Sequence, residues 1–421
     1  MKNVLDPSAP ASISSQNPGK PTRGITRRHG LLLTLMGSAL ALAGCGGGGG
    51  SALTAPTPVA PVTPVAASLA NGVITGFGSI IVGGVRYDDS AASIQDDNND
   101  RLTSAALKLG MVVRIKGGKS ANDGVSVRAK ADSIVVQSEL LGPIDSIDTA
   151  TGTLVVLGQA VKISATTVFE DGLVAADLTA GAVVEIYGFV DPANNVLSAT
   201  RVERKPGAKA FKLQGAISSL NAASKTFTLG SLTIGYLSAD LPASLVLANG
   251  LVVRVQMATA PLSGTRTALK IRKPEYEQED INEVEIEGIV TAYTSNAVFS
   301  VNGLVVNTNS ATKFELPVGV LPKVGDRIEV EGSTVNGVLM ATDVKLENDE
   351  DLYKFELHGL VSSLDVKAKA FMLRGVQVGY SDATEFTDGL THANFADGAS
   401  VEVKGVLIEG GGLLATRISK E

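Results

Sequence analysis

Short runs in which apolar and polar residues alternate recur along this chain, and glycine turns separate many of them. Alternation with a period of two places apolar side chains on one face of a β-strand and polar side chains on the other. In residues 299–306, the pair Asn302-Gly303 lies between two apolar arms. This pair predicts a two-residue hairpin turn, because both turn residues need a positive φ. The other four predicted turns are Val82-Gly83-Gly84-Val85, Leu157-Gly158-Gln159-Ala160, Leu229-Gly230-Ser231-Leu232 and Leu373-Arg374-Gly375-Val376.

The five predicted hairpins are regularly spaced. Counted from Val82, their starts advance by 75 residues once and then by 72 residues three times. A fixed period of this kind indicates tandem copies of one small structural unit. The predicted units are residues 72–139, 140–212, 213–283, 284–356 and 357–421.

Each unit has the same order of predicted elements. A first strand containing a glycine precedes the hairpin, then comes a short segment with helical character, such as residues 102–107 or 173–178, and then two strands. A glycine inside a strand marks a bulge or a tight bend. The order is that of an OB-like five-stranded barrel with its helix between strands three and four. The predicted fold is therefore all-β, a tandem array of about five OB-like barrels. The alternative is a stacked β-solenoid, whose repeats are usually shorter.

The first 44 residues predict an export signal. The apolar run 31–43 follows Arg27 and Arg28, and it is too short to span a bilayer but suits a signal-peptide core. It leads into residues 42–45, Leu-Ala-Gly-Cys, which resemble a bacterial lipobox. Cys45 is thus predicted to carry acyl chains such as palmitate and to anchor the protein to a membrane. Twin-arginine export and a later start codon remain open alternatives.

Residues 45–71 predict a tether without a core. Five glycines follow Cys45, and then four prolines between residues 56 and 64 favour polyproline II structure. Fully extended, this segment would reach roughly 80 Å. It would hold the barrels away from the membrane surface.

Composition narrows the classes of partner. Without residues 1–44 the chain has 31 basic and 42 acidic residues, a net charge of −11. An acidic surface does not suit a phosphate backbone, and no repeated aromatic-basic pattern accompanies the barrels, so no nucleic acid partner is expected. Cys45 is the single cysteine, which excludes an internal disulfide.

Two segments of the first unit carry a family resemblance. Residues 72–88 and 109–117 resemble the opening hairpin and a later strand of the bacterial repeat family called domain of unknown function 5666. Gly83 replaces the asparagine that is usual before the second turn glycine. The resemblance extends over residues 72–421 through degenerate copies, of which the third is the weakest. It implies an envelope lipoprotein built from small β-barrel modules, and it implies no activity.

The candidate catalytic residues are few. After Cys45 the chain has two histidines, His358 and His392. His358 occupies a variable slot of the first strand, so it is interpreted as an outward strand residue, whereas His392 falls in the short helical segment. No nucleophile elbow accompanies them, so a hydrolase triad is unsupported, although a two-carboxylate enzyme remains open. We expect no enzyme activity and no cofactor.

Acidic residues give weak metal candidates. Asp96, Asn98 and Asp100 place oxygen ligands at alternate positions, as at the start of a calcium loop. Arg101 stands at the glycine place and Leu107 at the place of the bidentate glutamate, so a solvated loop is favoured.

The junctions between units are charged. Acidic runs lie at residues 275–287 and 347–351, and a basic run lies at residues 201–212. These runs are interpreted as charged spacers. The alternatives are that opposite charges set the geometry between units, or that the acidic runs hold divalent cations.

The predicted function is that of a non-enzymatic outer-membrane lipoprotein facing the periplasm, with repeated barrels acting as an interaction or structural element. The alternative is a periplasmic protein that binds a glycan or small ligand in barrel grooves. The sequence leaves open the identity of the ligand or partner, and whether the protein is displayed at the cell surface.

Overall fold

The structure is a computed structural model that describes residues 67–421, except 125, 149, 171–172, 262, 275–278, 349–353 and 409–411. The predicted signal peptide, Cys45 and residues 46–66 of the tether lie outside the described residues. The described residues all belong to one compact unit. In the part of the chain that is described, no helix has the length and apolar character needed to cross a bilayer.

The second unit shows the common architecture, a closed five-stranded barrel. Its elements are β9 (Leu140–Asp148), β10 (Thr153–Val156), β11 (Gln159–Lys162), β12 (Val168–Phe169), η2 (Ala175–Asp177), β13 (Val183–Asp191) and β14 (Val196–Arg204). Strands β9, β10 and β11 form an antiparallel meander, β11 lies parallel to β14, and β13 pairs with both β14 and β9. The sheet therefore closes in the strand order of an OB-like barrel, as predicted.

The first and third units close in the same order. Barrel 1 contains β1 (Ala67–Val73), β2 (Gly76–Phe77), β3 (Ile80–Val82), β4 (Val85–Asp88), β5 (Ser93–Asp96), η1 (Ser104–Ala106), β6 (Val112–Gly118), β7 (Ala121–Asn122) and β8 (Val127–Gln137). Barrel 3 contains β15 (Phe211–Asn221), β16 (Thr226–Leu229), β17 (Leu232–Gly235), β18 (Val252–Met257) and β19 (Arg266–Arg272).

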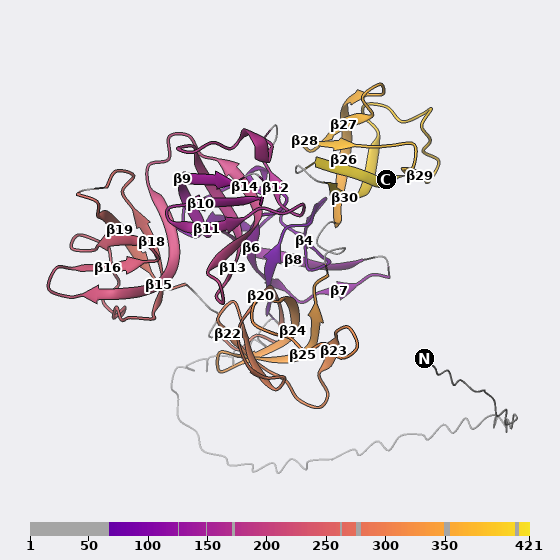
Figure 1. The fold of residues 1–421 in the computed structure, drawn as a ribbon. Coiled ribbons are helices and arrows are strands. Elements are labelled where there is room, and N and C mark those ends of the chain that lie inside the picture. Colours follow the sequence, from indigo (N-terminus) through magenta and orange to yellow (C-terminus); the bar gives the residue numbers. More distant parts are fainter. Residues whose placement is uncertain are drawn as a thin grey trace, which may run out of the picture. The chain divides into compact units, whose positions relative to one another are not determined.

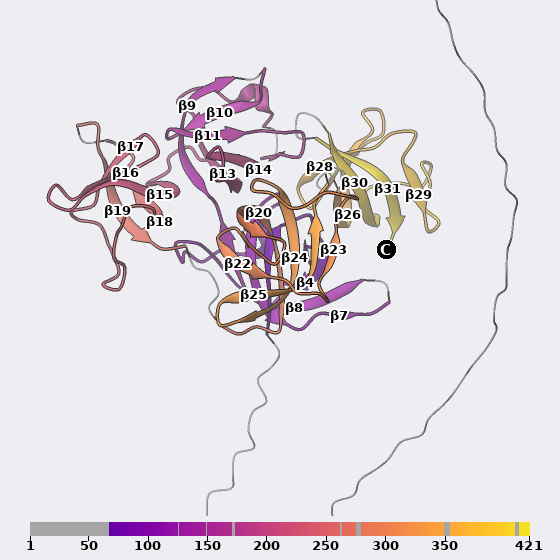
Figure 2. The ribbon, with the colours of Figure 1, turned by 60° about the horizontal axis from the view of Figure 1, so that its bottom comes forward.

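The fourth and fifth units have the same strand order (Figures 1 and 2). Barrel 4 contains β20 (Glu283–Ser295), β21 (Val298–Val301), β22 (Leu304–Asn307), β23 (Lys313–Glu315), β24 (Arg327–Val335) and β25 (Val338–Leu346). Barrel 5 contains β26 (Lys354–Asp365), β27 (Ala370–Leu373), β28 (Val376–Gly379), β29 (Glu385–Thr387), β30 (Ser400–Ile408) and β31 (Gly412–Lys420).

Two sequence predictions need correction, the start of barrel 1 and the helical segments. Strand β1 begins at Ala67, so residues 67–71 belong to barrel 1 and not to the predicted tether. They join the barrel because they pair with β6 along its length and bury Leu69 and Ala70. The predicted helical segments are single 3-10 turns in barrels 1 and 2, Ser104–Ala106 and Ala175–Asp177.

Four of the five hairpin turns match the prediction, and the turn of barrel 2 is shifted by one residue. Val156 pairs with Gln159, so its turn residues are Leu157 and Gly158, with φ of 49° and 71°. Leucine rarely adopts a positive φ. Here its side chain is buried against Gly142, at which a Cβ would lie 2.4 Å from Leu157 Cγ. Burial of this side chain compensates for the unfavourable backbone conformation.

A second recurring glycine marks a bulge in the fourth strand of the barrel, which is β6, β13, β24 or β30 and pairs with the fifth strand β8, β14, β25 or β31. Pairing with the fifth strand shifts register at Gly117, Gly188, Gly332 and Gly405. At each, a Cβ would lie between 2.0 and 2.3 Å from a carbonyl oxygen of the fifth strand. The backbones can therefore approach only where a side chain is absent. Barrel 3 has the buried Met257 at this bulge.

A Thr-x-Phe motif recurs in barrels 2, 4 and 5, at residues 167–169, 312–314 and 384–386, and it helps to close each barrel. The hydroxyls of Thr167, Thr312 and Thr384 each donate to an alanine carbonyl of the fifth strand at 2.8 Å. Each hydroxyl oxygen also accepts the backbone N–H three residues earlier. A buried hydroxyl needs such partners. This repeated motif is thus structural.

Strand pairing continues from barrel to barrel. Strand β1 lies parallel to β20 of barrel 4, β2 lies parallel to β26 of barrel 5, and β9 is antiparallel to β15 of barrel 3. Barrels 1 and 5 contribute to one apolar core cluster, and barrels 2 and 3 form another. Barrel 4 has its own cluster, which includes Leu69 from barrel 1. The units are therefore docked on one another rather than separate along the chain.

Candidate functional site

The predicted calcium ligands form a turn. The Asp96 carboxylate accepts backbone N–H groups of Asn98 at 2.9 Å and Asp100 at 2.8 Å. An aspartate that bonds the backbone two residues ahead is a common turn device. One oxygen of Asp96 is thus used to order the loop, and the metal assignment of Asp96, Asn98 and Asp100 gains no support from this geometry.

The neighbouring Asp97 makes the strongest polar contact of this loop, and the sequence analysis missed it. Its side chain is 3% exposed, and both of its oxygens lie 3.0 Å from Lys212 Nζ. Arg254 Nη1 lies 3.3 Å from the same carboxylate. Asp97 belongs to the β5–β6 loop of barrel 1, whereas Lys212 and Arg254 belong to β15 and β18 of barrel 3. A buried ion pair therefore joins barrels 1 and 3.

This ion pair continues into a network with barrel 2. Lys212 also donates to the Ser138 hydroxyl, which in turn donates to Glu185 at 2.6 Å. Glu203, nearby on β14, pairs with Arg201 and Lys205. Burial alone would raise the pKa of Glu203, but these two cations outweigh it and lower that pKa. Arg201, Lys205 and Lys212 of the basic run before barrel 3 are therefore paired with acidic groups. The Lys212 pair crosses from barrel 3 to barrel 1, which favours the hypothesis that opposite charges set the geometry between units.

Barrel 2 also reaches barrel 1 through its fifth strand. Thr200 Oγ1 donates to the carbonyl of Gly110 at 2.7 Å, and Arg201 Nη1 donates to the carbonyl of Leu109 at 3.0 Å. The corresponding Thr342 and Thr416 instead bond carbonyls inside their own barrels. The same repeat position thus serves docking in one unit and internal closure in others.

The acidic run of barrel 4 contacts barrel 1. Glu287 accepts the backbone N–H of Val73 at 3.0 Å, and Glu283 accepts that of Ser120 at 3.0 Å. A Cβ at Gly83 would lie 1.1 Å from Glu285 Oε1. The turn of barrel 1 therefore needs a glycine at this position, because Glu285 occupies the space that a side chain would take. Glu283, Glu285 and Glu287 are therefore docking residues rather than solvated spacers, whereas Glu279 is exposed.

Carboxylates crowd the face of barrel 4 around Glu285. Burial and the neighbouring Glu329 and Glu331 raise the pKa of Glu285 well above its ordinary value. Burial and the adjacent Glu347 raise the pKa of Glu329 to about 7, although Lys345 opposes the shift. Barrel 4 thus contains buried carboxyl groups that favour the protonated form.

His358 was predicted to point outward into solvent, and this prediction is wrong. The residue is 6% exposed, because β26 pairs with β2 of barrel 1 and places the imidazole against Gly78. Its Nε2 lies 2.7 Å from Glu356 and its Nδ1 lies 2.5 Å from Glu421. Burial alone would lower the pKa of His358, but these two hydrogen bonds outweigh it and raise that pKa.

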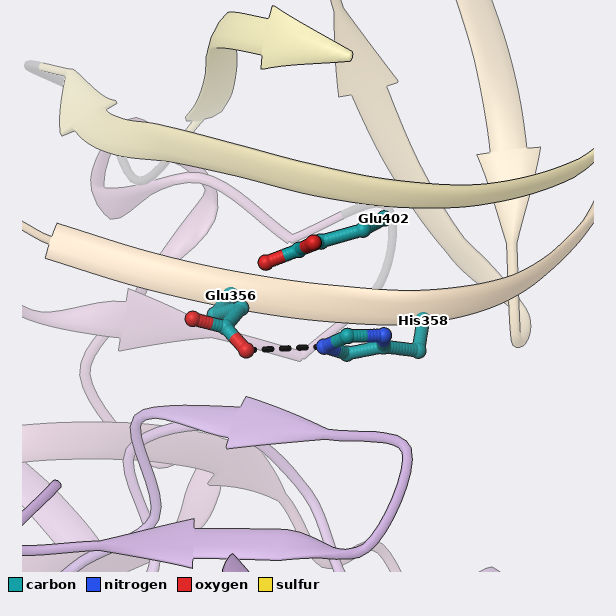
Figure 3. Close-up of side chains that lie close together, drawn as sticks. All are labelled: Glu356, His358 and Glu402. Carbon is teal, nitrogen blue, oxygen red and sulfur yellow. Dashed lines mark hydrogen bonds and ion pairs between the residues drawn. The ribbon is translucent and has the colours of Figure 1, made fainter. Parts of the chain in front are cut away.

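Glu356, His358 and Glu402 are close enough to be considered as metal ligands (Figure 3). The two carboxylates already have cationic partners, however. Arg86 of barrel 1 pairs with Glu356 and lies 3.7 Å from Glu402, and Lys404 lies 2.9 Å from Glu402. Both imidazole nitrogens are also held by carboxylates. The cluster therefore has the chemistry of a docking ion-pair network, which joins barrels 1 and 5.

His392 has a different environment. It is exposed, with its ring centroid 4.3 Å from that of Phe386 and 6.1 Å from that of Tyr380. These aromatic rings belong to the core of barrel 5, so His392 covers the edge of an aromatic cluster.

The comparison with protein families agrees with this repeated geometry. Residues 142–203, 287–345 and 358–419 match the family model described as Domain of unknown function (DUF5666). The chain is a DUF5666 repeat-containing protein. The three matched segments correspond to barrels 2, 4 and 5, and barrels 1 and 3 have the same strand order. A search of curated proteins finds no match.

Proposed function

We propose that this DUF5666 repeat protein is a non-enzymatic lipoprotein of the cell envelope, whose docked barrels act as an interaction or structural element. The observation that carries the proposal is the docking itself. Buried ion pairs join barrels 1 and 3, and strand pairing joins barrel 1 to barrels 4 and 5. Such contacts favour a defined arrangement of surfaces, which suits recognition of a partner.

The charged clusters support a structural role. In the Asp97 and His358 clusters, each charged group faces a group of opposite charge or a hydrogen-bond donor. A general base needs a free position toward its substrate. The lipobox at residues 42–45 supports membrane attachment through Cys45.

Palmitate labelling and fractionation test the location. Labelled wild-type protein in the outer-membrane fraction, together with an unlabelled and released Cys45→Ala variant, is the expected result. A wild-type chain without label, or a Cys45→Ala variant that stays membrane-bound, would contradict the lipoprotein proposal.

A pull-down from cross-linked envelopes tests the interaction role. We expect one envelope protein to be enriched with the wild-type chain and to be lost with the Cys45→Ala variant. If no envelope protein is enriched while the chain is found at the outer membrane, the interaction role is wrong. A ligand-binding role, which a cavity of about 480 Å³ among barrels 1 to 4 favours, would then be preferred.

A further inference from the structure

A cavity of about 480 Å³ lies where residues of barrels 1 to 4 meet. This volume is within the range of small-molecule sites. Much of its wall is apolar, and side chains from all four barrels contribute to it. Examples are Leu69, Phe189, Val252 and Leu304.

Three residues that line this cavity each have a buried polar atom without a hydrogen-bond partner. The atoms are Glu139 Oε2, Gln214 Oε1 and Arg254 Nε, and among the described residues no other buried side-chain nitrogen or oxygen is left without a hydrogen bond. An unsatisfied buried polar group destabilises a fold. The gathering of all three in one cavity therefore indicates a site that a ligand completes.

The charges around these atoms restrict the ligand. Arg254 and Lys212 are balanced by Asp97 and Glu139, because Asp97 pairs with both cations and Glu139 interacts with them electrostatically. Arg114, which also lines the cavity, has an interaction partner of its own. A ligand with a net charge would disturb this balance in a partly desolvated place. The cavity therefore favours a neutral molecule.

The donor or acceptor that each of the three groups needs restricts the ligand further. Arg254 Nε needs an acceptor, and Gln214 Oε1 needs a donor. Glu139 Oε2 is a carboxylate oxygen and also needs a donor, although burial raises the pKa of this group against the effect of Arg254 and Lys212. A hydroxyl group both donates and accepts. A ligand with several neighbouring hydroxyls on an apolar ring can satisfy all three groups and the apolar wall.

We propose that the cavity where barrels 1 to 4 meet binds a neutral mono- or disaccharide through Glu139, Gln214 and Arg254. This site goes beyond the interaction role proposed above. Arg254 is held in place by Asp97, so the contact between barrels 1 and 3 also positions the donor for the sugar. The repeat positions that dock the barrels thereby create the site.

The test is sugar binding by the purified full-length chain in detergent. Glucose, galactose, N-acetylglucosamine and disaccharides of each are added at millimolar concentration. Binding is followed by the shift in Tm and by saturation-transfer NMR. Glutamate and lysine, which carry a net charge, serve as charged controls, and glycine, a zwitterion without net charge, is a third control. A ligand that binds only the folded state raises Tm, so we expect a rise of a few degrees with at least one sugar and none with the controls.

Two variants locate the binding. Gln214→Leu removes an unpaired polar atom at similar volume, so its Tm without sugar is expected to equal or exceed that of the wild type while the sugar-induced shift is lost. Val252→Trp fills the cavity from a side chain that is 39% exposed, and Val298→Trp, at 40% exposure outside the cavity, is its matched control. We expect Val252→Trp to lose binding and Val298→Trp to retain it.

Each remaining outcome overturns the proposal. A flat response to every sugar means that the cavity holds solvent only. Binding retained in both Gln214→Leu and Val252→Trp places the sugar elsewhere. A shift with an amino acid and not with a sugar refutes the neutral saccharide. None of these results bears on Cys45 or on the envelope pull-down, so the two proposals fail separately.

Discussion

Replacing Asp97 with asparagine is expected to weaken the contact between barrels 1 and 3. The substitution keeps the size of the side chain but removes the charge that faces Lys212 and Arg254. The Lys212 and Arg254 side chains are only 5% and 13% exposed, so solvent cannot replace the lost carboxylate. Breaking a buried pair from one side typically costs about 3–5 kcal/mol. We expect a loss in this range.

The measurement is urea unfolding of the full-length chain, followed by far-UV circular dichroism. Asp132→Asn is the matched control, because Asp132 is also in barrel 1 but its pair with Lys130 is 4.0 Å long and both side chains are more than half exposed. An exposed pair contributes about 0–1 kcal/mol. The control should therefore unfold almost as the wild type does.

A double variant separates the ion pair from its surroundings. Asp97→Leu combined with Lys212→Met removes both charges of the shorter pair, and the cost should be smaller than for Asp97→Leu alone, since coupled residues are not additive. A loss below about 1 kcal/mol for Asp97→Asn would refute the reasoning, as it lies in the range of an exposed pair.

Two further predictions concern barrel 4. Gly332→Ala should destabilise the protein by about 3 kcal/mol, because its Cβ would lie 2.1 Å from the Met340 carbonyl oxygen. The control is Gly215→Ala, whose nearest neighbour lies at 3.8 Å, and it should change the urea midpoint little. Equal effects of the two substitutions would contradict the steric argument. Glu329→Gln should raise the free energy of unfolding at pH 8.5 by up to roughly 3 kcal/mol and leave it nearly unchanged near pH 4. The reason is that a carboxyl group with a raised pKa stabilises the folded state below pH 4.5, and this stabilisation is lost as the pH rises through about 7. Urea titrations at both pH values, with the exposed Glu385→Gln as control, measure this, and the same effect at both pH values would be incompatible with a raised pKa.

Local chemistry made the internal architecture of each barrel predictable. Two-residue turns with glycine, strands of period two and a repeat of about 72 residues were sufficient for the strand order of all five barrels. These features depend on neighbours within one hairpin or one strand. The turn of barrel 2 was the exception, since the position of Leu157 depends on its contact with Gly142 in another strand.

The candidate sites depended on contacts that no local pattern encodes. Thr75, Leu141, Gln214, Glu287 and His358 occupy one variable slot before the glycine of the first strand, and the sequence predicted that His358 pointed into solvent. In the structure Glu287 and His358 contact barrel 1, and Gln214 faces the cavity. The residue type at this position varies because the first strand of each barrel contacts a different neighbouring barrel or cavity.

Repetition in the sequence therefore determined the internal fold of each barrel, because closure of the sheet depends on the glycines, threonines and alternating strands that recur along the chain. Only the tertiary structure decided which barrels meet, which charges are buried and where polar atoms are left without partners. Asp97 and Lys212 are separated by 115 residues along the chain, yet both oxygens of the carboxylate lie 3.0 Å from the ammonium nitrogen. Long-range pairing of this kind arises from the docking of whole barrels, and the periodic pattern that builds each barrel contains no information about it.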